Sequence, residues 1–309
     1  MGADRPALPE RSALPLAESQ LARAEQSGDD AMSRPVPYTA GVRTSTMHTL
    51  RELMRTRKIL AVLIRRDLKL RYADSMLGYV WTVLEPLMMG SIYWFVFTVI
   101  FHRTVGAEPY IIFLLSGLLP FMWFTNGINE GIQSLASQRR LIASTSLPRQ
   151  IWVLRSTGAK SVEFLLSIPV LALFALFYRP QFDLQLVLFP VGFLIQLMLL
   201  LGLALLFSPI TMLVRDVEPL IRVATRALFY ASPIIYSLND VVVTSLPPVV
   251  VGLYKFNPLT GILECYRAGF FPGPVHWDAI LAAAAISAAI LAIGWTVFGR
   301  MERQVLKEV

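Results

Sequence analysis

The chain of 309 residues is 55% hydrophobic and only 16% charged, with a mean hydropathy of +0.57 and a formal net charge of +7. Soluble domains usually carry about 25% charged residues, so this composition excludes an ordinary soluble protein. Apolar runs of roughly 20 residues, the length that crosses a bilayer as a helix, recur along the sequence. They predict an all-α integral membrane protein.

The N-terminal region divides into two parts. Residues 1–47 are rich in Ala, Pro, Ser, Arg and Glu and have no signal-peptide core, which predicts a disordered cytosolic tail. Residues 48–76 are expected to hold an amphipathic interface helix, because apolar residues recur every four positions while basic residues lie outside that stripe. The stripe is Leu60, Ile64, Leu68 and Tyr72, and the basic residues are Arg65, Arg66 and Lys69. A basic amphipathic helix is typical of a membrane surface, although packing against a partner protein is the alternative.

Residues 77–309 are predicted to form a domain of six transmembrane helices. The expected spans are 77–101, 109–133, 161–178, 184–214, about 223–238, and 277–299. Residues 241–271 are also apolar, but Pro247–Pro248 and Asn257–Pro258 interrupt them. This stretch is therefore predicted to form two short re-entrant helices before the last span.

The distribution of positive charge predicts the orientation. With the N-terminus inside and six spans, the inner segments hold 24 of the 28 Lys and Arg residues. That asymmetry agrees with the positive-inside rule, so both termini are expected in the cytosol. The fragment "RRLIASTSLPRQIW", residues 139–152, then becomes a cytosolic loop between the second and third spans.

The sequence offers no convincing catalytic or metal site. The segment "RSTGAKS", residues 155–161, lacks the glycines that a phosphate-binding loop requires. The three histidines are scattered without ligand spacing, and the single cysteine, Cys265, is interpreted as a packing residue. The chain is thus predicted not to be an enzyme, to need no cofactor of its own and to bind no nucleic acid. An outward-facing membrane enzyme that modifies sugars or lipids stays as the alternative.

Ionisable and aromatic residues within the spans leave two interpretations open. Glu85, Glu130 and Glu163 are expected in the cytosolic half near Arg155 and Lys160, as structural ion pairs rather than as a conduction path. Aromatic side chains either form interfacial belts or line a passage for carbohydrate. The candidates for such a channel are Trp94, Phe121, Trp123, Phe124, Phe229, Tyr230 and Tyr236.

Four segments in this order resemble the membrane (permease) subunits of type-2 ABC exporters that move lipid-linked polysaccharides such as O-antigen, teichoic acid or galactan. They are "RRDLKLRYADSMLGYVWTVLEPL" (65–87), "SLPRQI" (146–151), "RDVEPLIRVATRALFYASPIIYSL" (215–238) and "NPLTGILECYR" (257–267). The resemblance covers about residue 64 to the C-terminus.

The resemblance implies a homodimer in the bacterial plasma membrane that works with two copies of a cytosolic ABC ATPase, where ATP and Mg²⁺ would bind. The loop 139–150 is then similar to a coupling helix, with Arg139, Arg140, Pro148 and Arg149 as contacts. Arg215, Asp216 and Glu218 would make the second contact. A basic loop suits a charged socket on a partner, although adhesion to the membrane surface is the alternative.

The resemblance also implies a lateral opening for the substrate from the inner leaflet, framed by residues 58–74 and the first span. Arg65, Arg66, Lys69 and Arg71 would meet the lipid pyrophosphate, since guanidinium groups suit phosphate. The motif spellings favour galactan as the glycan. A drug- or lipid-exporting ABC permease is the alternative within the class.

Overall fold

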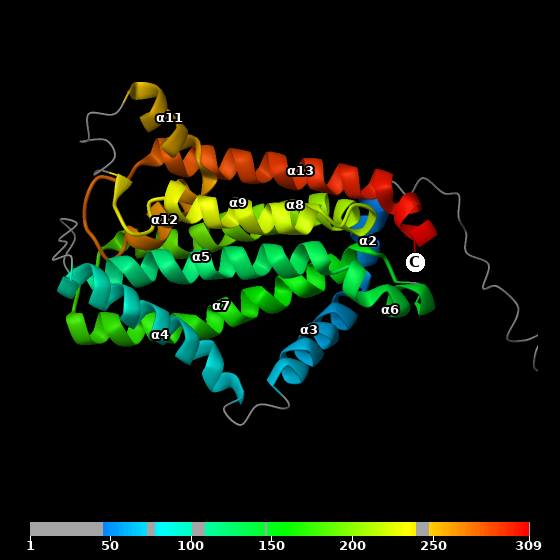
Figure 1. Cartoon of the computed structure of the whole chain (residues 1–309), viewed down its shortest axis with the longest axis horizontal. Helices are drawn as coiled ribbons and strands as arrows, with labels where there is room; N and C mark the ends of the chain where they lie inside the picture. Colours follow the sequence, from blue (N-terminus) through cyan, green and yellow to red (C-terminus); the bar gives the residue numbers. More distant parts are fainter. Residues whose placement is uncertain (1–45, 73–77, 101–108, 146, 239–246, 309) are drawn as a thin grey trace, which may run out of the picture. The chain divides into compact units, whose positions relative to one another are not determined.

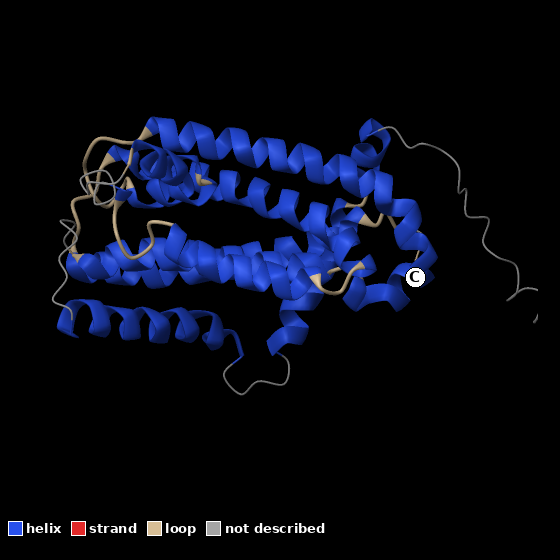
Figure 2. Cartoon of the chain, turned by 45° about the horizontal axis from the view of Figure 1, so that its top comes forward, coloured by secondary structure: helices blue, strands red, loops and turns tan. Residues whose placement is uncertain are grey.

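The computed structural model describes residues 46–72, 78–100, 109–145, 147–238 and 247–308 (Figure 1). These residues form helices and loops and no strand (Figure 2). Residues from Leu50 onward form one compact unit. The predicted cytosolic tail lies outside the described residues except for its last two positions.

Five helices within the described residues are long and apolar enough to cross a membrane: Val83–Ile100, Tyr110–Gln133, Gln150–Tyr178, Leu184–Leu213 and Trp277–Glu302. The first comprises α4 (Trp81–Trp94) and a π-helical continuation to Ile100. The other four spans are formed by α5 (Tyr110–Gln133), α7 (Gln150–Tyr178), α8 (Leu188–Leu213) and α13 (Trp277–Glu308), which continues beyond its span. The protein is therefore a multi-pass membrane protein, and these spans match five of the six predicted ones.

The remaining predicted span, the fifth in chain order at about 223–238, is not confirmed. Helix α9 (Val217–Ala231) has 15 residues and ends at Ser232, whose backbone is extended with φ −113° and ψ 147°. The next residue is Pro233, which disfavours a helical conformation at the residue before it. Since a helix rises about 1.5 Å per residue, 15 residues are short of a bilayer core of about 30 Å.

Two short helices, α11 (Pro248–Phe256) and α12 (Pro258–Arg267), occupy the stretch where two were predicted. Each begins at a proline, which has no backbone N–H to leave unpaired in a first turn. Asn257 caps α12, its side chain accepting a hydrogen bond from the Leu259 N–H. Helix α12 packs against α13, α8 and α5.

The helices run back and forth between two ends of the bundle (Figure 1). One end, called here the α6 end, holds the C-termini of α5 and α8, the short helix α6 (Arg139–Ser144) and the start of α9. The opposite end, the α12 end, holds the start of α5 and helix α12. Helix α7 begins at Gln150 rather than at residue 161, so the predicted loop between the second and third spans is mostly helical.

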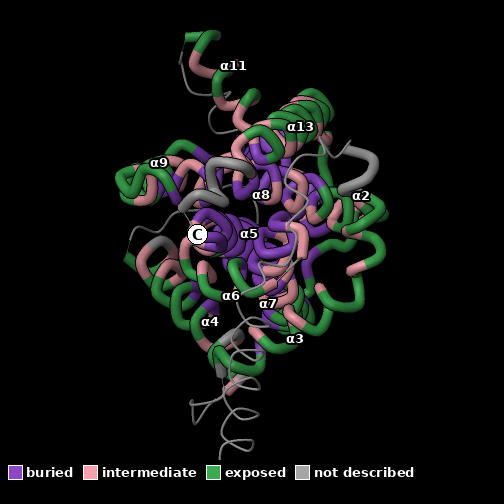
Figure 3. The backbone as a smooth tube through the Cα atoms, turned by 90° about the vertical axis from the view of Figure 1, so that its right-hand side faces the viewer, coloured by how far each residue is buried: buried purple, intermediate pink, exposed green. Residues whose placement is uncertain are grey.

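Helix α5 lies at the centre of the bundle and is buried along most of its length (Figure 3). Among the described helices, α8 and α13 form the most extensive contact, and Gly202 of α8 meets Gly294 of α13 there. A Cβ atom added to Gly294 would lie 2.2 Å from the carbonyl oxygen of Gly202. Small residues at such a contact let two helix backbones approach closely.

Before the spans, α2 (Thr46–Arg55) and α3 (Arg57–Tyr72) fill most of the predicted interface-helix region. Leu68 of α3 is buried, and Ile64 Cδ1 would lie 2.7 Å from a Cβ added to Gly158 of α7. The predicted apolar stripe therefore packs on the bundle. The side chain of its last member, Tyr72, lies outside the described residues.

Candidate functional site

Helix α6 is a short basic helix fixed to the α6 end of the bundle. Ile142 is buried in a cluster with Leu135, Ile151 and Phe298, which come from the α5–α6 turn, α7 and α13. Arg140 is exposed and Arg139 half-buried. One face of α6 is thus anchored against α7 and α13, while the opposite face is exposed.

The two remaining predicted contacts of this segment lie just after α6. Pro148 is half-buried, and its carbonyl accepts a hydrogen bond from the Ile151 N–H at 3.0 Å. Arg149 differs from Arg140, because only 9% of its side chain is exposed and its guanidinium lies 3.9 Å from the Glu302 carboxylate of α13. Arg149 therefore faces this chain rather than the surface.

The second predicted contact is the turn between α8 and α9. Arg215 and Asp216 are exposed. Glu218 accepts hydrogen bonds from Gln133 Nε2 at 2.7 Å and from Arg222 Nη1 at 2.6 Å. The bond to Gln133 joins the start of α9 to the end of α5, so the two predicted contact segments lie at the same end of the bundle.

Helix α3 carries a mixed basic and apolar outer face. Arg65, Arg66 and Lys69 are exposed there, and so are Val62 (64%) and Leu70 (58%). A face that combines basic and apolar side chains suits the boundary between lipid headgroups and acyl chains.

The fourth predicted basic residue of α3, Arg71, points the other way. Its guanidinium lies 2.5 Å from Glu130 of α5 and 3.1 Å from Glu163 of α7. Lys160 of α7 lies 3.0 Å from Glu130 and 2.7 Å from Glu163. These two cations and two anions form a cluster, which we call the α3 ion cluster, and it fastens α3 to α5 and α7.

The predicted structural ion pairs are confirmed for Glu130 and Glu163. A further pair joins Asp67 of α3 to Arg155 of α7, where the sequence had suggested that Arg155 lies near the glutamates. Glu85, in α4, forms no ion pair with any residue in the described ranges, although it lines a small cavity with Lys160 and Glu163.

A larger cavity of about 460 Å³ opens between α3, the end of α5 and the start of α7. Its charged lining residues are Asp67, Arg71, Glu130 and Arg155. Hydroxyl, amide and indole side chains and the apolar Leu70 complete its wall.

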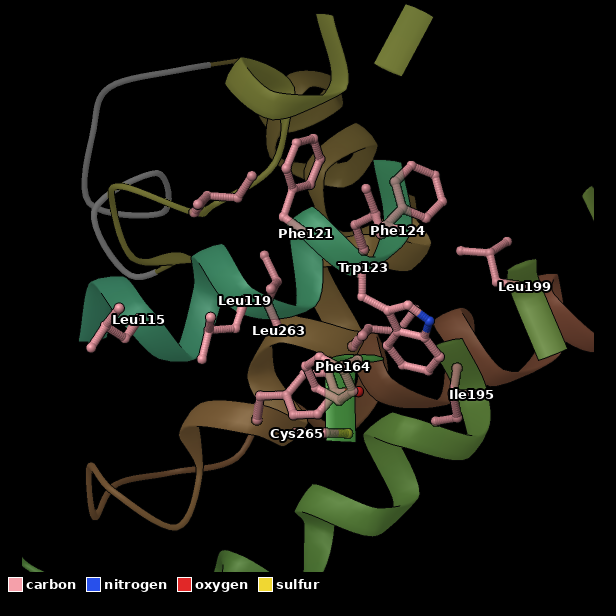
Figure 4. Close-up of a cluster of buried hydrophobic side chains, with 14 of the residues drawn as sticks. Leu115, Leu119, Phe121, Trp123, Phe124, Phe164, Ile195, Leu199, Leu263 and Cys265 are labelled. Atoms are coloured by element: carbon pink, nitrogen blue, oxygen red, sulfur yellow. The ribbon is translucent and has the colours of Figure 1, made fainter. Parts of the chain in front are cut away.

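Most candidate channel aromatics of α5 belong to the interior of the bundle. Trp123 is stacked between Phe164 of α7 and Phe193 of α8, with ring centroids 4.6 and 4.9 Å away. In Figure 4 the Trp123 ring points toward Phe164, whereas Phe121 and Phe124 extend from the other side of α5. All three α5 aromatics are buried, so none of them faces an open passage in the single chain.

The aromatics of α4 and α9 lie closer to the surface. Phe229 packs against Phe121 at 5.2 Å, and Tyr230 is 74% exposed. The Tyr236 hydroxyl donates to the Tyr230 carbonyl at 2.8 Å. Trp94 lines an apolar cavity of about 400 Å³ between α4, α5 and α7. Tyr230 and Trp94 are therefore the candidates that the fold leaves accessible.

Sequence reasoning missed Arg267 and the pairing of Gln133 with Glu218. Arg267 is buried in α12, where it donates to the carbonyls of Pro233 and Ile234 at 2.5 and 2.7 Å. An arginine in an apolar segment is itself a signal, because a buried charge needs partners. The Gln133 contact spans 85 positions and has no local signal.

The apolar spans define a multi-pass membrane protein, and comparison with known sequences gives its family. The profile of the ABC-2 type transporter family matches residues 59–271. The match covers well over half of the chain, which therefore belongs to this family of transporter membrane subunits.

The curated relatives are similar over most of their length. The chain is 29% identical over 250 residues to the O-antigen export system permease protein RfbA of Myxococcus xanthus, covering 81% of this chain and 94% of that protein. The RfbA of Klebsiella pneumoniae is 28% identical over 248 residues, covering 79% and 92%. The polysialic acid transport protein KpsM of Escherichia coli is 26% identical over 215 residues, covering 68% and 80%. These relatives are transporter permeases rather than enzymes.

Proposed function

We propose that the chain is the permease subunit of an ATP-driven exporter that moves a lipid-pyrophosphate-linked polysaccharide from the inner leaflet outward. The relatives named for O-antigen export and polysialic acid transport support the polysaccharide as the substrate class. The observation that carries the proposal is helix α6, which exposes Arg140 while Ile142 anchors it in the bundle. The motif spellings favour galactan as the particular glycan.

In this proposal the α6 end faces the cytosol of a bacterial cell, at the plasma membrane, and so do both termini. In the homodimer, residues 139–149 and 215–218 form the contacts with two copies of a separate ATPase subunit, which binds ATP and Mg²⁺. The inward-facing Arg149 positions the segment through Glu302, whereas Arg139, Arg140, Arg215 and Asp216 offer charge to the partner. Glu218 positions the second segment through Gln133.

The remaining crossing is made by α9 together with residues 232–238. Helix α9 starts at the α6 end and the extended segment after it reaches Arg267 at the α12 end. Helices α11 and α12 then lie in the outer part of the membrane as re-entrant elements. Two copies of the chain form the passage, since Tyr230 and the apolar surface of α9 are exposed in one copy.

The substrate enters beside α3. Arg65, Arg66 and Lys69 share an exposed face with apolar side chains and form no ion pair within the described residues, so they offer positive charge to a pyrophosphate at the membrane surface. Arg71 has two carboxylate partners and positions α3 instead. Replacing Arg65 and Arg66 by Gln is expected to reduce export without reducing assembly.

The test is co-purification of the chain with a candidate ABC ATPase from the same genome, followed by measurement of ATP hydrolysis. Arg139→Gln with Arg140→Gln is expected to weaken the complex, whereas Arg300→Gln, an exposed arginine of α13, is a matched control. A reporter fused at Ser144 locates the α6 end. An external Ser144, or a double variant with unchanged binding and hydrolysis, would refute the proposed coupling.

A further inference from the structure

The apolar cavity of about 400 Å³ beside Trp94 lies between α4 and α7, which pack against each other (Figure 1). We call it the α4–α7 cleft. Its lining residues are Ser91, Trp94, Phe95, Ile111, Phe174 and Tyr178. Ile111 is the second residue of α5 and Tyr178 is the last of α7, so the cleft lies near the α12 end of the bundle. Its volume falls in the range of about 300–1,000 Å³ that is usual for small-molecule sites.

The wall of the cleft suits a hydrocarbon chain. Five of its six lining residues are aromatic or aliphatic. The sixth, Ser91, already donates its hydroxyl to the Leu87 carbonyl at 2.7 Å. Phe95 is 51% exposed and Tyr178 is 48% exposed, and both belong to membrane spans. The cleft therefore opens toward the acyl chains of the bilayer, where a sugar or a phosphate would lose its hydration without gaining partners.

A positive charge follows the cleft directly in the chain. Arg179, the residue after Tyr178, is exposed and forms no ion pair within the described residues. The acidic residue nearest to it in the sequence is Asp183, whose carboxylate accepts a hydrogen bond from the Leu184 N–H at 2.6 Å. The guanidinium of Arg179 is thus available to an anion beside the cleft.

The backbone holds Arg179 in a conformation that is unusual for its residue type. Its φ is 45° and its ψ is 60°, and its N–H donates to the Ala175 carbonyl at 2.9 Å. Among the described residues it is the only one other than glycine with a positive φ. Glycine is the usual residue at such a helix end, because it has no Cβ to clash. An arginine under this strain points to a role for its side chain.

We propose that the α4–α7 cleft binds an anionic phospholipid of the bilayer, with an acyl chain beside Trp94 and Phe174 and the phosphate at Arg179. Arg179 follows the end of a span, so it lies at the depth of the headgroups, whereas the cleft lies at the depth of the acyl chains. A guanidinium group suits a phosphate, and basic sites between transmembrane helices bind anionic headgroups. The assignment requires only that the α12 end lies at a membrane surface, so it is independent of the direction of transport.

Quenching of tryptophan fluorescence by brominated lipids tests the assignment in the full-length protein. The protein is reconstituted in phosphatidylcholine vesicles that contain increasing fractions of brominated phosphatidylglycerol, which is anionic, or of brominated phosphatidylcholine with the same chains. The difference between the original protein and Trp94→Phe gives the signal of Trp94. Half-quenching of Trp94 is expected at an about fivefold lower fraction of phosphatidylglycerol, the effect of one arginine near an anionic headgroup.

Two substitutions of Arg179 test the headgroup contact. Arg179→Gln and Arg179→Gly are both expected to remove the preference for phosphatidylglycerol. The glycine variant also relieves the backbone strain, so loss of the preference in it does not reflect a damaged fold. Lys255→Gln is the matched control, because Lys255 is a cation of α11 that is paired with Asp278 at 2.7 Å and does not line the cleft. It should keep the preference.

A larger side chain in the cleft tests the position of the acyl chain. Ser91→Leu is expected to raise the half-quenching fraction of both lipids, because the new side chain occupies the space of the acyl chain. Ala172→Leu is the matched control, since Ala172 is an exposed residue of α7 outside the cleft. It should leave both fractions unchanged.

The assignment is overturned if the two lipids quench Trp94 at equal fractions, or if both Arg179 variants keep the preference. It is also overturned if Ser91→Leu has no more effect than Ala172→Leu. Absence of quenching by either lipid would overturn it as well, and would show that another element, such as a second copy of the chain, covers the cleft.

Discussion

Arg267 and Phe113 face each other across the α12 end, with the guanidinium carbon 3.7 Å from the centre of the aromatic ring. The same guanidinium donates hydrogen bonds to the carbonyls of Pro233 and Ile234. It thus joins α12 to the start of α5 and to the extended segment after α9. Those carbonyls belong to a stretch without helical hydrogen bonds, so a buried arginine satisfies groups that an apolar environment leaves unpaired.

Arg267→Gln is therefore expected to destabilise the protein by on the order of 3 kcal/mol, since hydrogen bonds to charged groups contribute about 1.5–3 kcal/mol each. Thermal unfolding of the purified protein in detergent measures the effect. Arg267→Lys should be intermediate, because it keeps the charge but loses the planar fork. A Gln variant as stable as the original would show that these bonds contribute nothing.

Gly294→Ala is expected to loosen the contact between α8 and α13. The new Cβ would lie 2.2 Å from the Gly202 carbonyl oxygen, so the helices must separate, at a cost of about 1–3 kcal/mol for overpacking. The readout is the unfolding midpoint.

Gly299→Ala on the same helix is the matched control, since its Cβ would meet no atom within 4 Å. Alanine favours a helix over glycine by about 1 kcal/mol, so this variant should be neutral or stabilised. Equal losses in both variants would contradict the role of the glycine contact.

Arg71→Gln is expected to loosen α3 from the bundle, because it removes one of the two cations of the α3 ion cluster and leaves Glu130 and Glu163 facing each other with Lys160 alone. Hydrogen exchange of the amides in residues 57–72 should become faster. Arg66→Gln, an exposed residue of the same helix, serves as the control and should leave exchange unchanged. Identical hydrogen exchange in the two variants would show that the α3 ion cluster does not hold α3 against α5 and α7.

Cys265 is expected to resist thiol reagents in the folded protein. Burial raises the pKa of its thiol from 9.0 to about 12, so the reactive thiolate is scarce at pH 8 and increases only as the pH approaches 12. Maleimide labelling should be slow in the native protein and fast in denaturing detergent. Rapid native labelling at pH 8 would mean that α12 opens to solvent.

The long helices could be predicted from the sequence to within a few residues. The span expected at 109–133 is α5, Tyr110–Gln133, and the last expected span also begins at Trp277. A hydropathy profile detects such helices because each one has about 20 consecutive, mostly apolar residues, the length that crosses the bilayer core. It did not see that α7 starts at Gln150, because the added turns carry polar residues such as Lys160 that pair with other helices.

The span expected at about 223–238 is not confirmed as a single helix, for a local reason that the sequence contained. Pro233 breaks the helix after Ala231, yet the apolar composition of 223–238 hides the break. By contrast, no local sequence pattern indicated whether a given arginine side chain points outward or into the bundle. Arg71 and Arg149 look like the exposed arginines beside them, and only contacts across the fold turn them toward Glu130 and Glu302.

The sequence by itself determined the environment of this protein, the positions of five long apolar helices and its family motifs, because burial in lipid is a property of continuous runs of residues. The tertiary structure alone decided which charges are paired, which aromatics are interior and where a polar cavity lies. Those features depend on contacts between residues far apart in the sequence, and a linear pattern carries no information about such contacts until the helices pack.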